Sequence, residues 1–481
     1  MPTPNRNVIT VEGTDRTFSR VRILFVLLMS MGMSLIAVSS VNVALPALEQ
    51  GLDASSSDLQ WVLTGYALAI GVTLIPAGRA GDVLGRGAFF VVGAAIFTIA
   101  SLACGLAPTP LLLNLARIVQ GIGAGLFSPQ VTGMIQQYFS GGGRAKAFAL
   151  LGVVISASVA VGPVLSGAII SALGEETGWR WAFFIYLPVG LAAVVLALLW
   201  FPFETERQLR NPGRARSRID LDPVGTVLVV AIVLAVMYPF MARQPLAWTL
   251  LAVAPVLLWI WIRWERGYAE SGREPIVDLT LFRYRSYRNG LMVSGAVFLG
   301  VTSTFAVLAL FLQSGLGVSA IFAGLIGLPN AISSAISATV TARYVLSHGR
   351  QLVILAVVLL LTGTLLSLLV AWLIGAFGIS FWWLSPTLVL NGLGMGIFGS
   401  ANQTLSMQDI PPAHGGTASG IKQTIERITT ALGNAAITGL FFVVVADVSW
   451  VSGIAAAYAA IAVCLVVAFG LGLMDRRQHA R

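Results

Sequence analysis

Residues 117–125 read Arg-Ile-Val-Gln-Gly-Ile-Gly-Ala-Gly and lie inside an apolar run that extends from 110 to 137. A membrane-spanning helix needs about 20 mainly apolar residues, so this run is long enough to cross a bilayer. Counted from Leu111 at a helical rise of about 1.5 Å per residue, Arg117 would lie roughly 9 Å into the membrane. A buried arginine costs several kcal/mol unless it is paired or hydrated, which favours a functional role for Arg117 over a structural one.

The whole chain shares this apolar character. Charged residues make up 10% of the 481 residues and hydrophobic residues 57%, whereas about 25% of an ordinary soluble protein is charged. A soluble globule cannot bury so much apolar surface, so we expect a polytopic membrane protein in contact with the lipid bilayer. The net charge of +9 does not indicate nucleic-acid binding, because the arginines lie in short loops between apolar runs. Cys104 and Cys464 lie inside apolar runs, and we expect neither a metal site nor a cofactor.

Fourteen runs are long and apolar enough to span a membrane. They lie near 21–45, 57–79, 88–107, 110–137, 147–173, 181–202, 223–241, 246–263, 289–313, 319–344, 351–375, 379–403, 416–445 and 451–474. The connections alternate in charge, with arginines gathered on one side of the membrane and, on the other, Glu49, Asp53, Glu175, Glu176 and Asp447 with only Arg180 and Arg243 as cations. The positive-inside rule therefore predicts that both termini are cytoplasmic, which an even number of spans allows.

An internal repeat appears in the polar residues of the spans. The pattern of an amide followed by alternating glycines at 120–125 recurs at 391–396, 271 residues later. The same offset places Asn42 on Gln313 and Gly162 on another glycine. Three coincidences at one offset indicate a duplicated six-span unit, which is typical of transporters.

The repeat predicts how the chain is divided. We expect a cytoplasmic tail over 1–20, an N-terminal six-helix bundle over 21–202, cytoplasmic linkers with two inserted helices over 203–288, a C-terminal six-helix bundle over 289–475, and a short cytoplasmic tail over 476–481. Within the second linker, apolar and basic residues alternate from Leu281 to Arg288. This segment either lies flat on the membrane surface or is a solvated basic connector.

The loop after the second span carries the most specific motif. It reads Gly78-Arg-Ala-Gly-Asp82-Val-Leu-Gly85-Arg86. Its glycines permit a tight turn and a close approach of helices, while Asp82 can accept hydrogen bonds from a helix N-terminus or from an arginine. This loop closely resembles the signature loop of the major facilitator superfamily.

Two further motifs extend the resemblance. Arg117, followed by Gln120 and Gly121, resembles the second signature of the superfamily. Gly162-Pro163, with a glycine four residues after the proline, resembles the antiporter signature of its efflux members. A lone glycine pair would indicate only close helix packing, so the combination carries the resemblance.

Three stretches are similar to the fourteen-span drug:proton antiporter branch of that superfamily, whose members include multidrug efflux proteins. They are Val41-Asn-Val-Ala-Leu-Pro46, Leu59-Gln-Trp-Val-Leu-Thr-Gly-Tyr66 and Trp179-Arg-Trp181 with Pro188-Val-Gly190. The resemblance implies an all-α integral membrane protein with the major facilitator fold, in which 14 transmembrane helices form two six-helix bundles and two inserted helices.

The chain departs from this branch at one position. Members usually carry an acidic residue in the first span, five residues before the asparagine that corresponds to Asn42, and here that position is Ala37. Alanine cannot exchange a proton, so the usual coupling site is missing. Arg117 would then attract an anionic substrate or balance a proton with Asp58 or water, or else transport is coupled differently or not coupled to protons at all.

The resemblance also implies which residues form the site. A central cavity lined by the first, fourth, ninth and twelfth spans would be large, apolar and sparsely polar, as suits amphipathic substrates. Substrate and proton pathway residues are predicted to be Arg117, Asn42, Gln120, Gln313, Asn391, Trp61, Tyr66 and Asp58. Gating and conformational positions are predicted to be Gly78, Asp82, Gly85, Arg86, Gly121, Gly125, Gly162, Pro163 and Gly167.

These features predict a monomeric secondary transporter in a bacterial plasma membrane that exports small amphipathic drugs or metabolites by alternating access, with protons as the coupling ion. The alternative is uptake, or uncoupled transport of an anionic metabolite. A membrane enzyme would need a catalytic constellation, but the three histidines lie in loops or the tail, and no catalytic motif is present, so no catalytic residue is expected. A channel would usually rely on oligomeric symmetry instead of a duplicated half.

Overall fold

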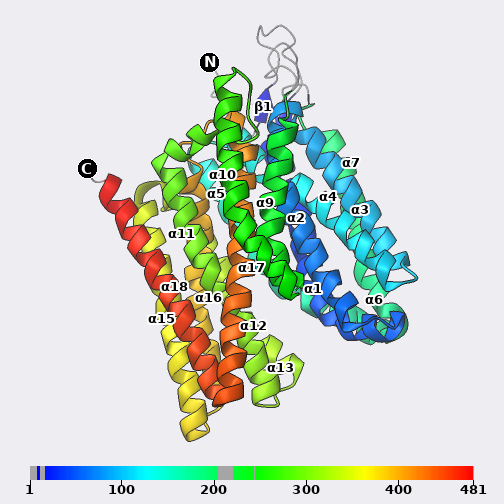
Figure 1. Cartoon of the computed structure of the whole chain (residues 1–481), viewed down its shortest axis with the longest axis vertical. Helices are drawn as coiled ribbons and strands as arrows, with labels where there is room; N and C mark the ends of the chain where they lie inside the picture. Colours follow the sequence, from blue (N-terminus) through cyan, green and yellow to red (C-terminus); the bar gives the residue numbers. More distant parts are fainter. Residues whose placement is uncertain (1–7, 11–16, 204–219, 243, 480–481) are drawn as a thin grey trace. The chain divides into compact units, whose positions relative to one another are not determined.

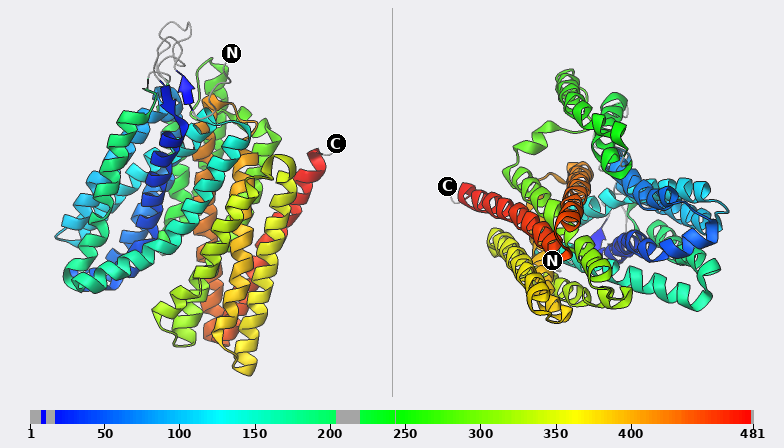
Figure 2. Two further views of the ribbon diagram at one scale, coloured as in Figure 1. Left: turned by 180° about the vertical axis from the view of Figure 1, so that it is seen from behind. Right: turned by 60° about the horizontal axis from the view of Figure 1, so that its bottom comes forward.

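The structure is a computed structural model that describes residues 8–10, 17–203, 220–242 and 244–479 (Figures 1 and 2). Among these residues, 14 helical segments are long and apolar enough to cross a membrane, which is the number predicted from the sequence. Each segment overlaps one of the predicted runs, so the span count and the all-α fold class are confirmed.

The first half contains six spans built from seven helices. They are α1 (Arg20–Leu52), α2 (Ser56–Leu84), α3 (Arg86–Leu106), α4 (Pro110–Tyr138), α5 (Gly141–Leu173), α6 (Glu175–Phe184) and α7 (Tyr186–Trp200). Local chemistry sets several of the boundaries. Ser55 and Asp58 form a capping box at the start of α2, and Thr109 caps α4 ahead of Pro110. Gly85 ends α2 with a φ of 112°, a conformation that favours glycine.

The inserted pair and the second half follow. The inserted helices are α9 (Pro223–Ala242) and α10 (Thr249–Glu270), with the short turn η1 (Pro245–Trp248) before α10. The second half comprises η2 (Leu279–Arg283), α11 (Arg285–Val301), α12 (Ser303–Leu310), η3 (Phe311–Gly315), α13 (Ala320–Leu325), α14 (Leu328–Thr341), α15 (Val345–Phe377), η4 (Phe381–Trp383), α16 (Leu384–Ser406), η5 (Pro412–His414), α17 (Gly415–Asp447) and α18 (Trp450–His479).

The ninth and tenth spans are broken where the sequence predicts continuous runs. The ninth changes direction between α11 and α12, where the hydroxyl of Thr302 donates to the carbonyl of Phe298 at 2.8 Å. Such back-bonding within a helix often bends it. The span then ends in the π-helical turn η3, which contains the predicted pathway residue Gln313. The apolar runs did not reveal these breaks, because the few polar residues at them, such as Thr302 and Ser303, lie within long stretches that are otherwise apolar.

Two peripheral segments differ from the sequence prediction. The N-terminal tail contains a short antiparallel pair, β1 (Val8–Thr10) with β2 (Thr17–Ser19), which no pattern indicated. In the 281–288 segment, Leu281 and Tyr287 are buried within the protein and α11 already begins at Arg285. The apolar side of this segment therefore packs on protein, not on lipid. Most of the arginine-rich linker at 203–222 lies outside the described residues.

The helices group into two compact units. The first consists of Met1–Ser140, Val161–Leu281 and Ile410–Thr424, and the second of Gly141–Ala160, Phe282–Asp409 and Ile425–Arg481. Each unit therefore includes part of α5 and part of α17. Division of α5 and α17 fits their length, since each has 33 residues.

The same packing occurs within each unit. In the first, α4 packs against α2 and α3, and in the second, α16 packs against α14 and α15. With the repeat offset, these are equivalent helices, as a duplicated unit predicts. α15 and α18 lie side by side in Figure 1, and α18 also packs against α11. The inserted helices α9 and α10 form a pair, drawn in green in Figure 2, and α9 packs against α2 of the first unit.

Candidate functional site

Arg117 lies in the interior of the first unit. It is 1% exposed, and its Nε donates to the carbonyl of Val62 on α2 at 3.0 Å. Its guanidinium carbon lies 4.0 Å from the centre of the Tyr66 ring, one helical turn further along α2. A guanidinium over an aromatic face is attracted to it, most strongly where water is excluded. α2 thus holds Arg117 by a carbonyl and an aromatic ring.

A chain of hydrogen bonds connects Arg117 to α3. Its Nη1 donates to Oε1 of Gln120 at 2.6 Å, and Nε2 of Gln120 donates to the hydroxyl of Ser101 at 2.7 Å. Ser101 in turn donates to the carbonyl of Phe97 at 2.7 Å. The amide of Gln120 is therefore oriented at both ends, which fixes the position of the arginine.

Two tyrosines join this cluster to α1. The hydroxyls of Tyr66 and Ser34 lie 3.0 Å apart, and the hydroxyls of Tyr186 and Ser40 lie 2.6 Å apart. All four side chains are buried. Together with Arg117, Gln120 and Ser101 they form what we call the Arg117 cluster.

No ion pair between Arg117 and a carboxylate occurs among the described residues. The groups that influence its charge are Cys104, Tyr66 and Tyr186, none of which is ionised at neutral pH in the ordinary case. Ala37, the position at which the family resemblance implies an acid, is fully buried in α1, three residues after Ser34 on the same side of the helix. Among the described residues, the positive charge of the guanidinium is therefore stabilised by polar groups and aromatic rings, without a carboxylate.

The structure brings three of the predicted pathway residues together, namely Arg117, Gln120 and Tyr66. Asp58 instead lies in the exposed capping box with Ser55, where its carboxylate accepts from the Ser55 backbone at 3.1 Å. The ring of Trp61 packs on Tyr238 of α9, with ring centres 6.1 Å apart.

The other predicted pathway residues are found elsewhere. Asn42 and Gln313 are exposed on α1 and η3. Asn391 is buried in the second unit, and both polar atoms of its side chain lack a hydrogen-bond partner.

The signature loop holds the start of α17 through Asp82. Its Oδ1 accepts from the backbone of Gly416 at 2.9 Å, and its Oδ2 accepts from the backbone and hydroxyl of Thr417 at 2.7 and 2.8 Å. Oδ1 also accepts from Nε of Arg86 at 2.9 Å. Both kinds of donor predicted for Asp82, a helix N-terminus and an arginine, are therefore present. This placement favours a negative charge, because the positive end of the helix dipole faces it.

Arg86 ties the same loop to α4 and η5. It donates to the carbonyl of Gly133 at 3.0 Å, to Oε1 of Gln137 at 2.8 Å, and to the carbonyl of Pro412. It is 4% exposed, so these contacts and Asp82 take the place of its hydration shell. The loop residues predicted to gate the transporter thus form one buried ionic network.

The predicted glycines pack closely against neighbouring helices. A β-carbon at Gly121 would lie 2.5 Å from the Tyr66 carbonyl, and one at Gly125 would lie 2.7 Å from Cβ of Thr73. One at Gly78 would overlap the backbone of Gly416, and one at Gly162, next to Pro163 in α5, would overlap the Ser39 hydroxyl. Gly167 is less tightly packed, with Val43 at 3.6 Å.

Comparison with known proteins assigns the family. The model of the Major Facilitator Superfamily matches residues 27–434. The chain belongs to this superfamily. It is 35% identical over 419 residues to a probable actinorhodin transporter of Streptomyces coelicolor, covering 85% of this chain and 70% of that protein. It is 30% identical over 399 residues to the puromycin resistance protein pur8 of Streptomyces alboniger, covering 82% and 76%.

A solved structure supports the same fold. The crystal structure of the human organic anion transporter MFSD10 (TETRAN) aligns with a TM-score of 0.68 and 16% identity, covering 94% of this chain and 99% of that one. The protein is therefore a multi-pass membrane transporter of the major facilitator superfamily with 14 spans, and not an enzyme.

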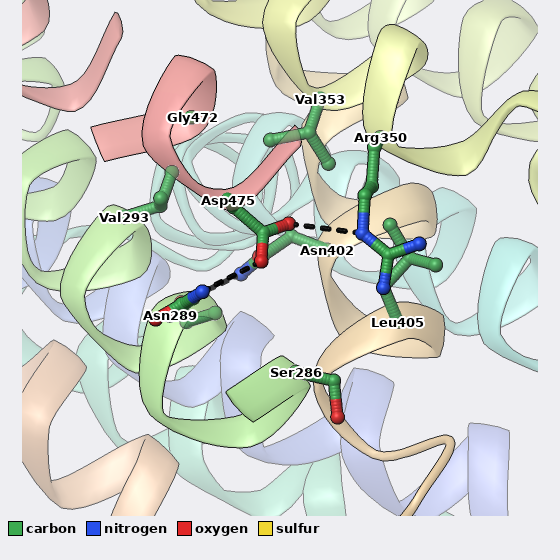
Figure 3. Close-up of a pocket in the computed structure, with 10 residues that line it drawn as sticks. Ser286, Asn289, Val293, Arg350, Val353, Asn402, Leu405, Gly472 and Asp475 are labelled. Atoms are coloured by element: carbon green, nitrogen blue, oxygen red, sulfur yellow. Dashed lines mark hydrogen bonds and ion pairs between the residues drawn. The ribbon is translucent and has the colours of Figure 1, made fainter. Parts of the chain in front are cut away.

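A second polar cluster of this transporter lies within the second unit, around a small hollow between α11, α15, α16 and α18 (Figure 3). Asp475 forms an ion pair with Arg350 at 3.2 Å and accepts from Nδ2 of Asn289 at 2.7 Å. Arg350 and Arg86 occupy corresponding Gly-Arg motifs of the two halves. The carboxylate that pairs with Arg350 lies on the last helix, α18, whereas Asp82, which pairs with Arg86, lies on the helix before it. The sequence did not single out Asp475 or Asn289.

Ser101 and Tyr186, which belong to the Arg117 cluster, were also not predicted as site residues from the sequence. Serines in apolar spans most often bond to their own helix backbone, so nothing distinguishes Ser101 before the α3–α4 pairing is known. Tyr186 lies between the Trp179–Trp181 and Pro188–Gly190 stretches, which provided its only signal.

Proposed function

We propose that this chain exports small amphipathic molecules, of the antibiotic or secondary-metabolite class, across a bacterial plasma membrane by alternating access. Support for export comes from the relatives, which are named as a probable actinorhodin transporter and a puromycin resistance protein and align over more than four fifths of this chain. Both termini are proposed to be cytoplasmic, on the positive-inside rule.

The observation that carries the substrate proposal is the buried guanidinium of Arg117 without a carboxylate partner. A cation in a low-dielectric interior favours the approach of an anion far more than it would in water. Tyr66 covers this cation in the present conformation. Substrates that carry a carboxylate or an acidic phenol would therefore gain the most once the Tyr66 ring moves aside.

Proton antiport is the proposed driving reaction, although Ala37 removes the usual first-span acid. Because Ala37 is buried and the Arg117 cluster contains no carboxylate, uncoupled transport of an anionic metabolite is the second candidate.

Inverted membrane vesicles that contain the purified chain decide between these functions. An exporter accumulates an anionic amphipathic dye in the lumen of such vesicles, and a proton antiporter does so only while the lumen is acidic. Entry of the dye that proceeds only to equal concentrations inside and outside, at a rate that a protonophore does not change, would establish the uncoupled alternative. Absence of accumulation in inverted vesicles, together with uptake in right-side-out vesicles, would contradict export.

A further inference from the structure

Two buried carboxylates face each other at the ends of the inserted helices. Asp222 precedes the first residue of α9 and is 0% exposed, while Glu265 lies near the end of α10 and is 1% exposed. Neither was predicted as a site residue. Buried acidic side chains are rare unless they are paired with cations, hydrogen-bonded or protonated.

Each carboxylate uses only one of its oxygens. Oδ1 of Asp222 accepts from the backbone of Gly225 and from the indole Nε1 of Trp264, both at 2.9 Å. Oε2 of Glu265 accepts from the backbone of Val277 at 3.4 Å. The remaining oxygens, Oδ2 of Asp222 and Oε1 of Glu265, are buried and have no hydrogen-bond partner among the residues that the structure describes.

The two unpaired oxygens flank the same point. A β-carbon at Gly225 would overlap Oδ2 of Asp222 and would lie 2.7 Å from Oε1 of Glu265. Glycine at 225 therefore leaves room for the two carboxylates to approach each other. Two ionised carboxylates this close in a buried site repel strongly, and a proton held between them removes the repulsion and satisfies both oxygens.

We propose that Asp222 and Glu265 share one proton and so form a proton-binding site in the inserted helix pair. A proton suits the site better than a metal ion, because no group of three or more His, Cys, Asp or Glu side chains that could hold a metal occurs in the described part of the chain.

The other charged and titratable groups around the pair already have partners. Asp220 accepts from the hydroxyl of Tyr268 at 2.6 Å, and Arg273 lies 5.4 Å from the centre of the Tyr268 ring. From α2, Arg79 donates to Glu274 at 2.8 Å. Trp261 lies one turn before Glu265 on the same face of α10. The negative charge of a deprotonated pair is thus opposed mainly by Arg79.

Arg79 links this site to the signature loop, since it lies between Gly78 and Asp82. It is 6% exposed, its charge acts on Glu265, and its Nε is buried without a hydrogen-bond partner. Loss of the shared proton places an extra negative charge beside this guanidinium and draws it away from Glu274. A change of pH at the inserted helices would thereby change the contacts of Arg79 in the loop that holds α17. This last step rests on the proposed transport function, whereas the proton site itself does not.

Infrared difference spectroscopy of the purified full chain in lipid, recorded against pH, tests the site. We expect a carbonyl stretch of a buried protonated carboxyl that titrates with pH and shifts in D2O. Asp222→Asn and Glu265→Gln should each shift this band and the pH at which it changes, because the proton is then held by a single buried carboxyl. The double variant should abolish the band. Asp220→Asn, a neighbouring acid with its own tyrosine donor, is the matched control and should keep the band.

A band that survives in the double variant, or its absence from the wild type over the whole pH range in which the protein is folded, would overturn the proposal. A change on adding Na+ or K+ at constant pH, without a change on varying pH, would also overturn it in favour of a cation site. The spectra need no transported substrate, so they remain interpretable if the export proposal fails. Transport assays of the same variants then test the link through Arg79, which predicts a flattened pH dependence, and an unchanged pH profile would contradict that link.

Discussion

The Arg117 cluster of the first unit and its repeat counterpart in the second unit share their packing but not their chemistry. At the offset of 271 residues, Arg117 corresponds to Leu388 and Gln120 to Asn391, and all four side chains are buried. The glycine after each amide packs tightly on its neighbouring helix, Gly121 on α2 and Gly392 on α14. The charge and its hydrogen bonds are present only in the first unit.

This difference distinguishes residues that the duplicated fold needs for packing from residues that we expect transport to need. Close helix packing at Gly121 and Gly392 is common to both units, so it belongs to the scaffold. A buried arginine occupies this position in the first unit, where Gln120 orients it and Tyr66 covers it, whereas the second unit has Leu388 there. In the other unit, Asn391 is a buried amide without partners. We therefore assign substrate chemistry to the Arg117 cluster.

The largest expected effect distinguishes Arg117 from Leu388. Arg117→Ala should lower the transport rate by about tenfold to a hundredfold, because hydrogen bonds to charged groups contribute about 1.5–3 kcal/mol. Leu388→Ala should lower the free energy of unfolding by about 2–5 kcal/mol while leaving transport per folded molecule near wild type. Counterflow in proteoliposomes, normalised to folded protein, measures both. Equal losses of transport in the two variants would contradict the claim that only the first unit provides the substrate contacts.

The packing shared by the two units is tested with glycine substitutions. Gly121→Ala and Gly392→Ala should each lower the free energy of unfolding by about 1–3 kcal/mol, since backbone carbonyls that cannot move aside lie in the way. Gly399→Ala on the same helix as Gly392 is the matched control, because nothing lies within 4 Å of its β-carbon position. Thermal unfolding in detergent should show two destabilised variants and one unaffected control. A destabilised control would mean that helix flexibility, and not packing, is responsible.

The amides at equivalent positions should respond with opposite signs. Gln120→Leu removes the acceptor of Arg117 Nη1 and the donor to the Ser101 hydroxyl, and should destabilise the protein by about 1–3 kcal/mol. Asn391→Leu replaces a buried amide that has no partner, and should be neutral or stabilising. Both are measured by chemical unfolding. Reduced transport by a folded Asn391→Leu variant would show that the second unit also contributes polar contacts to the substrate.

Sequence reasoning predicted the scaffold well because a bilayer imposes simple rules. Long apolar runs, arginine-rich loops and the repeat at 271 gave the number of spans and the fold class, and the loop motif indicated both kinds of donor to Asp82. The site was harder, because its members act through contacts between helices. Arg117 was evident as a lone charge in an apolar run. Asn42 and Gln313, which the repeat pairs, are exposed, and their place in the substrate pathway stays a prediction. Asp222 and Glu265 lie 43 residues apart in sequence, and only the packing of α9 on α10 reveals that they meet.

The smallest expected effect comes from the Tyr66 hydroxyl. Tyr66→Phe keeps the ring beneath Arg117 but removes the contact with Ser34, so it should cost only about 0.5–1.5 kcal/mol of stability. Tyr66→Leu also removes the aromatic face, whose desolvated cation–π contact with Arg117 contributes about 2 kcal/mol, and should strengthen binding of an anionic substrate because the guanidinium is no longer covered. Binding of a fluorescent substrate to the two variants separates the ring from the hydroxyl. Identical affinities would exclude a role for the ring.

The most direct test of the assignment to Arg117 is discrimination between a carboxylate-bearing amphipathic dye and its methyl ester. Initial rates of transport of the two dyes are measured in inverted vesicles with wild-type protein and with Arg117→Ala. We predict that the wild type prefers the carboxylate and that the variant loses this preference while it still transports the ester. An unchanged preference in a folded Arg117→Ala variant would contradict the assignment of substrate chemistry to the Arg117 cluster.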